Sequence, residues 1–90
     1  MNMLSPDKKG KESDIRFFIE KVVKFIVDKP HDVSVNESEE EGTTVFRLRV
    51  GQGDLGKVIG KNGQNANALR KLIGAIGAKY GQRVQLKILE

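Results

Sequence analysis

Residues 58–63 read Val-Ile-Gly-Lys-Asn-Gly, with Lys57 before them and a helical pattern on either side. Two glycines three apart, with Lys61 and Asn62 between them, predict a tight exposed turn, because glycine bends without a Cβ penalty and lets another backbone come close. The following run, 64–79, predicts a helix, so the turn lies at a helix N-terminus. Unpaired N–H groups and the positive end of the helix dipole collect there and favour a phosphate. Between Leu55 and Leu89 the chain has no Asp or Glu that would repel such an anion.

The composition limits the classes of protein that can carry this turn. Ninety residues, 38% hydrophobic and 31% charged, predict one globular domain with a single core. The chain has no Cys and one His, which excludes disulfides, thiolate metal sites and a histidine zinc site. No apolar run approaches the ~18 residues of a membrane span, and no signal-peptide pattern is present. We therefore expect a cytoplasmic protein with no membrane contact, no metal and no cofactor.

Charge is distributed unevenly along the chain. Residues 1–44 carry seven Lys or Arg and ten Asp or Glu, whereas residues 45–90 carry nine and two. The net charge of +4 thus comes from the half that holds the glycine turn. A basic region around a phosphate-binding turn favours a polyanionic partner.

The periodicity of apolar residues predicts the element order α-β-β-α-α-β. Residues 1–12 are polar and aperiodic and predict a flexible tail. Ser13 is expected to cap a helix that starts at Asp14 and stops before Pro30. Strands are expected at 32–36, 43–50 and 83–89, with an acidic turn at 37–42, a helical turn at 54–59 and the long helix at 64–79. The core faces of the first and last helices are expected to hold Ile15, Phe18, Ile19, Val22 and Ile26, and Ala66, Leu69, Leu72, Ile73 and Ile76.

Each predicted strand has one apolar and one polar face, which places the helices on one side of the sheet. The first two strands are joined closely enough to be antiparallel, and the last follows a helical crossover and can run parallel to the second. We therefore expect an α+β domain over residues 13–90, with three helices packed on one face of a three-stranded mixed sheet. The open face is expected to carry Val45, Arg47, Arg49, Gln85 and Lys87.

Two motifs in the same region resemble nucleotide sites but lack essential partners. Gly51 to Gly56 fits G-x-G-x-x-G, yet no acid follows about 20 residues on to hold a ribose. The same glycines with Lys57 approach a phosphate-binding P-loop, but Val58 replaces the Ser or Thr that would hold magnesium. The basic half of the chain offers no catalytic arrangement of Ser, His and acid. We expect neither enzyme activity nor a small-molecule substrate.

From residue 55 to 63 the chain reads Leu-Gly-Lys-Val-Ile-Gly-Lys-Asn-Gly, followed by Ala66, Leu69 and Arg70 in the next helix. This stretch resembles the signature of a KH domain, an RNA-binding module whose GXXG loop clamps four nucleotides. The predicted element order resembles the type II arrangement, and one small KH domain is similar to the KhpA family of stand-alone bacterial RNA-binding proteins. The resemblance covers nearly the whole chain. It implies single-stranded RNA as ligand, a role as post-transcriptional regulator or RNA chaperone, homodimerisation, and pairing with a larger KhpB-type KH protein.

The mechanism that the resemblance implies is binding without catalysis. Backbone N–H groups of residues 60–63 would meet phosphates, with charge from Lys57 and Lys61, and either Val58 or Ile59 would face outward towards a base. The exposed face of the following helix would reach sugars or base edges. The predicted RNA-binding residues are Lys57, Val58, Ile59, Gly60, Lys61, Asn62, Gly63, Gln64, Asn67, Arg70 and Lys71.

Two alternatives remain open. In the first, the glycine turn only connects two helices and its lysines are solvated. In the second, the KH fold is a protein-interaction module that acts mainly as a homodimer or heterodimer. Gly74 and Gly77 lie off the core face of the long helix. Because glycine costs roughly 1 kcal/mol against Ala in a helix interior, close approach of a second backbone is one reason to keep them.

Overall fold

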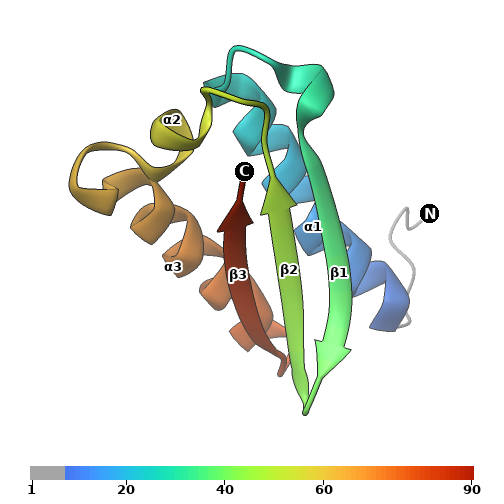
Figure 1. The fold of residues 1–90 in the computed structure, drawn as a ribbon. Helices are drawn as coiled ribbons and strands as arrows, with labels where there is room; N and C mark the ends of the chain where they lie inside the picture. The colour runs from blue at the N-terminus through green and yellow to red at the C-terminus, as the bar shows by residue number, and fades with distance from the viewer. Residues whose placement is uncertain (1–7) are drawn as a thin grey trace.

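The computed structural model of this chain describes residues 8–90, with side-chain burial from Asp14 onward. Within these residues, three α-helices pack on one side of a three-stranded sheet (Figure 1). The predicted α+β fold with the order α-β-β-α-α-β is therefore confirmed. Its elements are α1 (Lys8–Ile26), the 3-10 turn η1 (Pro30–Asp32), β1 (Ser34–Glu40), β2 (Thr43–Arg49), α2 (Leu55–Ile59), the 3-10 turn η2 (Lys61–Gly63), α3 (Gln64–Lys79) and β3 (Arg83–Leu89).

The sheet has the order β1-β2-β3, with β2 in the centre. β1 and β2 pair antiparallel through a two-residue turn, Glu41 and Gly42, in which φ is 51° and 80°. Turns with two positive φ angles match the twist of hairpin strands. β2 and β3 pair parallel, because α2 and α3 form the crossover between them. Both pairings agree with the prediction.

β1 is displaced from its predicted position at both ends. Asp32 belongs to η1, so the strand begins at Ser34, and the expected acidic turn at 37–42 is strand up to Glu40. Arg47 on β2 explains the extension, because its Nη2 lies 2.8 Å from Glu40 Oε2 and its Nη1 donates to Ser38 Oγ at 2.9 Å. Glutamate has a low strand propensity, but these cross-strand contacts are non-local and offset it.

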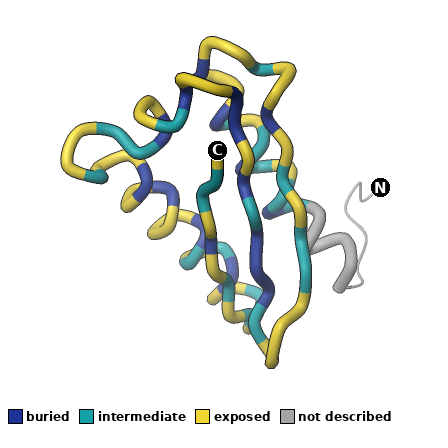
Figure 2. Tube along the Cα trace, viewed as in Figure 1, coloured by how far each residue is buried: buried dark blue, intermediate teal, exposed yellow. Residues whose placement is uncertain are grey.

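The core lies between the sheet and the helices, as the dark blue segments of Figure 2 show. It centres on Phe46 and Leu48 of β2, which are fully buried. Two residues expected in the core lie at the surface instead: Leu72 is 52% exposed and Ile26 is 36% exposed. The buried large or apolar side chains of the two long helices are Ile15, Ile19 and Val23 of α1 and Ala66, Leu69 and Ile73 of α3. The buried face of α1 is thus turned towards Val23, away from Ile26.

The open face of the sheet carries the expected charged residues. Arg49, Gln85 and Lys87 are exposed there, and Arg47 is half-buried. Val45 lies on the same face yet is 1% exposed. It belongs to the central strand, where Ser38 of β1 and Gln85 of β3 flank it; the neighbouring side chains cover it without a helix.

α1 begins at Lys8, earlier than the expected first residue Asp14. Ser13 therefore lies inside the helix and is not its cap. Lysine, which makes up much of residues 8–13, has a high helix propensity, so the helix extends although no apolar period marks this segment. The rest of the predicted tail lies outside the described residues, and the domain boundary at residue 13 stays a prediction. Within the described range, no helix is both long enough and apolar enough to cross a membrane.

Candidate nucleic-acid interface

The predicted turn forms a compact loop between α2 and α3. The Gly60 N–H donates to Gly56 O at 2.8 Å and ends α2, and the Gly63 N–H donates to Gly60 O at 3.1 Å. Gly60 has φ 77° and ψ 172°, a conformation almost restricted to glycine. Asn62 (φ 56°) and Gly63 (φ 75°) follow with left-handed backbone. The chain's own hydrogen bonds therefore define the loop.

Asn65, in the first turn of α3, stabilises this loop with its side chain. Its Nδ2 donates to Lys57 O at 3.0 Å. A Cβ placed on Gly60 would come within 2.6 Å of Asn65 Cγ. Gly60 is thus required for space as well as for its dihedral angles. Asn65 was not among the predicted site residues, because a polar residue in the first turn of a helix gives no periodic signal.

Two backbone donors of the loop are unpaired. The N–H groups of Lys61 and Asn62 take no part in the hydrogen bonds found among the described residues, and both side chains are exposed. All four N–H groups of residues 60–63 were expected to be available. Two are not, because those of Gly60 and Gly63 close the loop itself. A pair of free N–H groups beside a lysine at a helix start suits an anion.

α2 contributes Lys57, Val58 and Ile59, which lie differently from one another. Val58 is 1% exposed and packs in the core. Its side chain therefore cannot contact a base, and of the two candidates only the half-buried Ile59 reaches the surface. The Lys57 side chain is 45% exposed, and its Nζ lies 3.4 Å from Asp28 Oδ2. An acidic group thus approaches this region from the end of α1, although none is near in the sequence.

The remaining predicted residues share the exposed face of α3. Arg70 also reaches across to β3, where its Nη2 donates to Leu86 O at 3.2 Å. A hollow lies between α3 and β3, and Arg70 is the one predicted site residue that lines it. The exposed predicted residues of α3 are Gln64, Asn67, Arg70 and Lys71. The hollow is lined by Arg70, Ile73, Val84, Gln85, Leu86 and Lys87.

β3 was not predicted to belong to the site. Within the described part of the chain, β3 pairs with β2 alone, so no strand covers its other edge, which borders the hollow. The unpaired N–H and C=O groups of an edge strand can bind an extended ligand. Edge position follows from the order of strands in the sheet, which the alternation of residues within one strand does not reveal.

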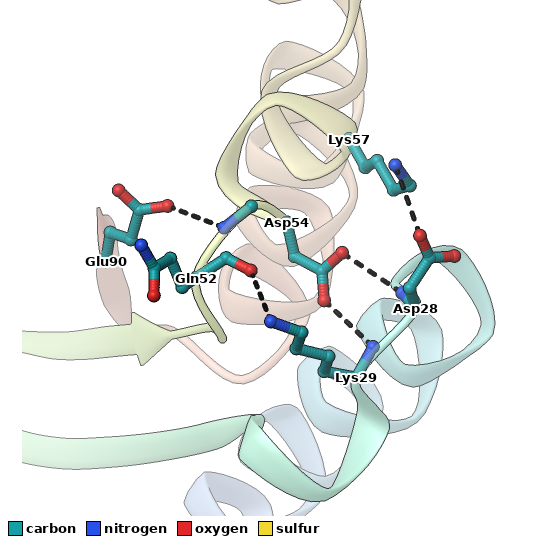
Figure 3. A network of polar contacts seen from close by, with 7 residues as sticks. Asp28, Lys29, Gln52, Asp54, Lys57 and Glu90 are labelled. Atoms are coloured by element: carbon teal, nitrogen blue, oxygen red, sulfur yellow. Dashed lines mark hydrogen bonds and ion pairs between the residues drawn. The ribbon is translucent and has the colours of Figure 1, made fainter.

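Asp54 anchors α2 to the end of α1 (Figure 3). Its buried carboxylate accepts the Asp28 N–H at 3.1 Å and the Lys29 N–H at 2.9 Å. Burial alone would raise the pKa of Asp54, but the two N–H donors, together with Lys57 and Lys29, outweigh it and lower that pKa below its ordinary value. A charged carboxylate therefore fixes where α2, and the loop after it, begins.

The first glycine run, 51–53, is occupied by contacts within the chain. A Cβ on Gly51 would approach Asp32 Oδ2 to 2.9 Å and Lys29 Cδ to 3.1 Å. Lys29 Nζ donates to Gln52 O at 2.9 Å. The first glycine of the literal G-x-G-x-x-G pattern thus reflects close packing against the connection between α1 and β1, whereas Gly53 and Gly56 would have space for a Cβ.

Known proteins match this chain over most of its length. A family model described as KhpA/KhpB, KH domain, matches residues 16–88. The protein named RNA-binding protein KhpA from Borreliella burgdorferi is 50% identical over 72 residues, 80% of this chain and 88% of the relative. Its namesake from Aquifex aeolicus is 49% identical over 78 residues, covering 87% and 99%. That from Chlamydia trachomatis is 37% identical over 73 residues, covering 81% and 94%. The chain therefore belongs to the KhpA/KhpB family of KH domains.

Proposed function

We propose that this protein binds single-stranded RNA through the loop at 60–63 and the hollow between α3 and β3, without catalysis. The observation that carries the proposal is the geometry of the loop: the unpaired N–H groups of Lys61 and Asn62 lie beside the Lys61 side chain where α3 begins. The name of the relatives, RNA-binding protein, supports RNA as the ligand. Regulation or chaperoning of RNA after transcription is the role that such binding would serve.

RNA is expected to run from the loop along the hollow. One phosphate would accept the two free N–H groups, and the next nucleotides would extend between α3 and the free edge of β3. Arg70 and Lys87, which line the hollow, place positive charge along this path. The exposed Asn67 and Gln64 offer amide groups to sugars or base edges.

Sequence preference is expected to be modest. Stacking on aromatic side chains is a main way in which proteins select unpaired bases. Neither aromatic residue in the second half of the chain is placed for it: Phe46 is buried in the core, and Tyr80 follows the end of α3 that lies away from the loop. The proposed contacts are instead to the backbone of the RNA, which every sequence shares.

Replacing Lys61 and Asn62 together by Asp tests the proposal. Both side chains are exposed, and Asp tolerates the left-handed backbone at position 62, so the fold should persist. Two negative charges at the phosphate seat should lower the affinity for a short unstructured RNA at least tenfold, about 1.4 kcal/mol. If two to four phosphates are contacted, the wild-type slope of log affinity against log salt should be roughly −1.4 to −2.8. The double variant should flatten it by about one or two units.

A matched control separates the site from overall charge. Replacing Lys21 of α1 and Asn36 of β1 by Asp makes the same change in net charge at exposed positions away from the loop. This control should bind RNA nearly as the wild type does. Circular dichroism checks the fold of each variant. A folded loop variant with wild-type affinity would exclude the loop as the phosphate site.

A second function, as a homodimer or heterodimer module, is favoured by an apolar surface between α1 and α3. Leu72 and Ile26 are exposed beside each other there and border a shallow hollow. Clustered exposed apolar residues mark contact surfaces, and a second copy or a KhpB-type KH protein would cover them. The hollow is lined by Val22, Ile26, Val58, Asn65, Ala68, Leu69 and Leu72.

The dimer proposal rests on this surface rather than on the glycines of α3. Gly77 is explained within the chain, because a Cβ there would lie 2.9 Å from Gln82 O and 3.0 Å from Val84 Cγ1. Gly74 meets open space. Leu72→Asp should dissociate a dimer in sedimentation experiments while short RNA still binds. Wild-type protein that stays monomeric at tens of micromolar would exclude the homodimer, and a mixture with a KhpB-type protein would test the heterodimer.

A further inference from the structure

Asp28 brings a negative charge to Lys57 from the acidic half of the chain. It lies two residues after Ile26, the last residue of α1, and its Oδ2 lies 3.4 Å from Lys57 Nζ. The two side chains are 75% and 45% exposed. The ammonium group of Lys57 is therefore held by a carboxylate and is at the same time open to a ligand from solution.

We propose that Asp28 sets the RNA affinity of this protein by competing with an RNA phosphate for Lys57. The proposal rests on the RNA-binding function proposed above and adds to it a residue outside the loop and α3. A carboxylate and a phosphate are both acceptors for a charged lysine. A phosphate that approaches Lys57 must displace the Asp28 carboxylate or share the lysine with a like charge close by, and either step weakens binding.

The arrangement is held by buried contacts on one residue, Asp54. The Asp54 side chain accepts the Asp28 N–H at 3.1 Å (Figure 3), and the Asp54 carbonyl accepts the Lys57 N–H at 3.0 Å. The backbone of both partners is thus fixed by the same buried residue. An ordinary exposed ion pair is weakened because both side chains lose conformational freedom when it forms. Here the backbones of Asp28 and Lys57 are already held close to each other, so less freedom is lost.

The exposure of the pair sets the size of the effect. Exposed ion pairs contribute little, because water and salt screen them. Removal of the carboxylate should therefore raise RNA affinity by about twofold to fivefold and not by orders of magnitude. Asp28 accordingly adjusts the affinity of the loop and does not switch it off.

A double-mutant cycle with Asp28→Asn and Lys57→Gln tests the proposal on a short unstructured RNA at low salt. Asp28→Asn keeps the backbone N–H that Asp54 accepts, so its unfolding curve should match the wild type. It should bind about twofold to fivefold more tightly, and its salt slope should steepen by up to about 0.7, the value for one further phosphate on a single strand. Lys57→Gln should bind more weakly, and adding Asp28→Asn to it should change nothing further.

Glu41→Gln is the matched control. It removes the same charge from an exposed residue in the turn between β1 and β2, at the end of the sheet away from α2 (Figure 1). It should leave RNA affinity unchanged, which excludes an effect of net charge alone. Asp28→Ala, which also removes the carboxylate, serves as a second variant if Asp28→Asn unfolds.

The outcomes separate this inference from the function on which it rests. Wild-type protein that binds no RNA would end both. RNA binding by the wild type with no gain in folded Asp28→Asn or Asp28→Ala would overturn the role of Asp28 and leave the RNA-binding function in place. An equal gain in the Lys57→Gln background would show general repulsion instead of competition for Lys57, and would also overturn it.

Discussion

The two glycine runs of this chain, at 51–53 and 60–63, are alike in sequence and opposite in their surroundings. The first is turned towards its own chain: Asp32 and Lys29 approach Gly51 closely, and the Gly53 N–H donates to Glu90 Oε2 at 3.2 Å. The second is turned to solvent, and the N–H groups of Lys61 and Asn62 stay unpaired among the described residues. A glycine in such a run can mark a close contact, as at Gly51 and Gly60, or only a positive φ, as at Gly53. Only the fold shows whether the backbone N–H groups of the run are bonded within the chain or are left for a ligand.

Dihedral angles alone do not separate the two runs. Gly53 has φ 90° and Gly60 has φ 77°, so both require glycine. The difference lies in what a Cβ would meet: nothing within 4 Å at Gly53, and Asn65 Cγ at 2.6 Å at Gly60. Substitution at the two positions should therefore have different consequences for stability and for RNA binding.

The largest effect is expected for Gly60→Ala. The φ and ψ of Gly60 cost another residue about 1–3 kcal/mol, and the clash with Asn65 adds to this. RNA affinity should fall as well, because the strained loop can no longer present its free N–H groups. Urea unfolding and RNA titration measure the two losses. Gly56→Ala, in α2 with open space around it, is the control and should be neutral or slightly stabilising; equal stability of both variants would contradict the role of Gly60.

Gly53→Ala should lower stability by a smaller amount and leave RNA binding intact. The positive φ costs a residue with a Cβ about 1–2 kcal/mol, but the open space around Gly53 adds no clash. The fraction of protein that remains folded should bind RNA with wild-type affinity, since this run lies outside the proposed site. Titration well below the unfolding temperature tests this. A loss of affinity as large as that of Gly60→Ala would remove the distinction between the runs.

Sequence patterns predicted what is local in this molecule. The long helix was expected at 64–79 and is Gln64–Lys79, and the last strand was expected at 83–89 and is Arg83–Leu89. Strong periodicity within these elements, with Gly63 before the helix and Gly81 after it, defines their ends. The glycine loop was found for the same reason, since its residues are consecutive.

Features that depend on distant residues were missed. Glu40 is strand because Arg47 pairs with it across the hairpin, and Asp28 reaches Lys57 from the other half of the chain. The free edge of β3 follows from the order of the whole sheet. Leu72 fits the apolar period of α3 yet is exposed, because periodicity identifies an apolar side of a helix without stating how much of it the core covers.

Asn65→Ala should have a smaller effect on stability, and it tests how much of the cost of Gly60→Ala comes from the clash with Asn65. Loss of the hydrogen bond from Asn65 Nδ2 to Lys57 O should cost about 0.5–1.5 kcal/mol. The same change removes two of the three atoms that a Cβ on Gly60 would meet, Asn65 Cγ and Nδ2, and leaves Asn65 Cβ at 2.9 Å. Gly60→Ala should therefore cost less in the Asn65→Ala background than in the wild type, with the dihedral cost and the close contact to the Cβ of residue 65 remaining. Strict additivity in urea unfolding would mean that the clash with the Asn65 amide group contributes nothing.

The smallest expected effect is a pH dependence that originates at Asp54, the residue between the two runs. Its folded pKa is lowered, so its carboxylate contributes stability that is fully present above the ordinary Asp pKa of about 3.9 and is lost as the pH falls through the lowered value. From pH 7 to pH 5 this group should therefore leave stability unchanged. Below about pH 4 the wild type should lose stability, and Asp54→Asn, which does not titrate, should lose less.

Glu40 provides the comparison for this experiment. Hydrogen bonds from Arg47 and Ser38 also lower the pKa of Glu40, so Glu40→Gln should flatten the same acidic part of the profile. The two variants should differ in RNA binding at pH 7, because Asp54 anchors the helix before the loop whereas Glu40 lies at the end of β1. Urea unfolding from pH 3 to pH 7 at constant ionic strength gives the profiles. If Asp54→Asn and the wild type lose stability in parallel on acidification, Asp54 is not the charged link between α1 and α2.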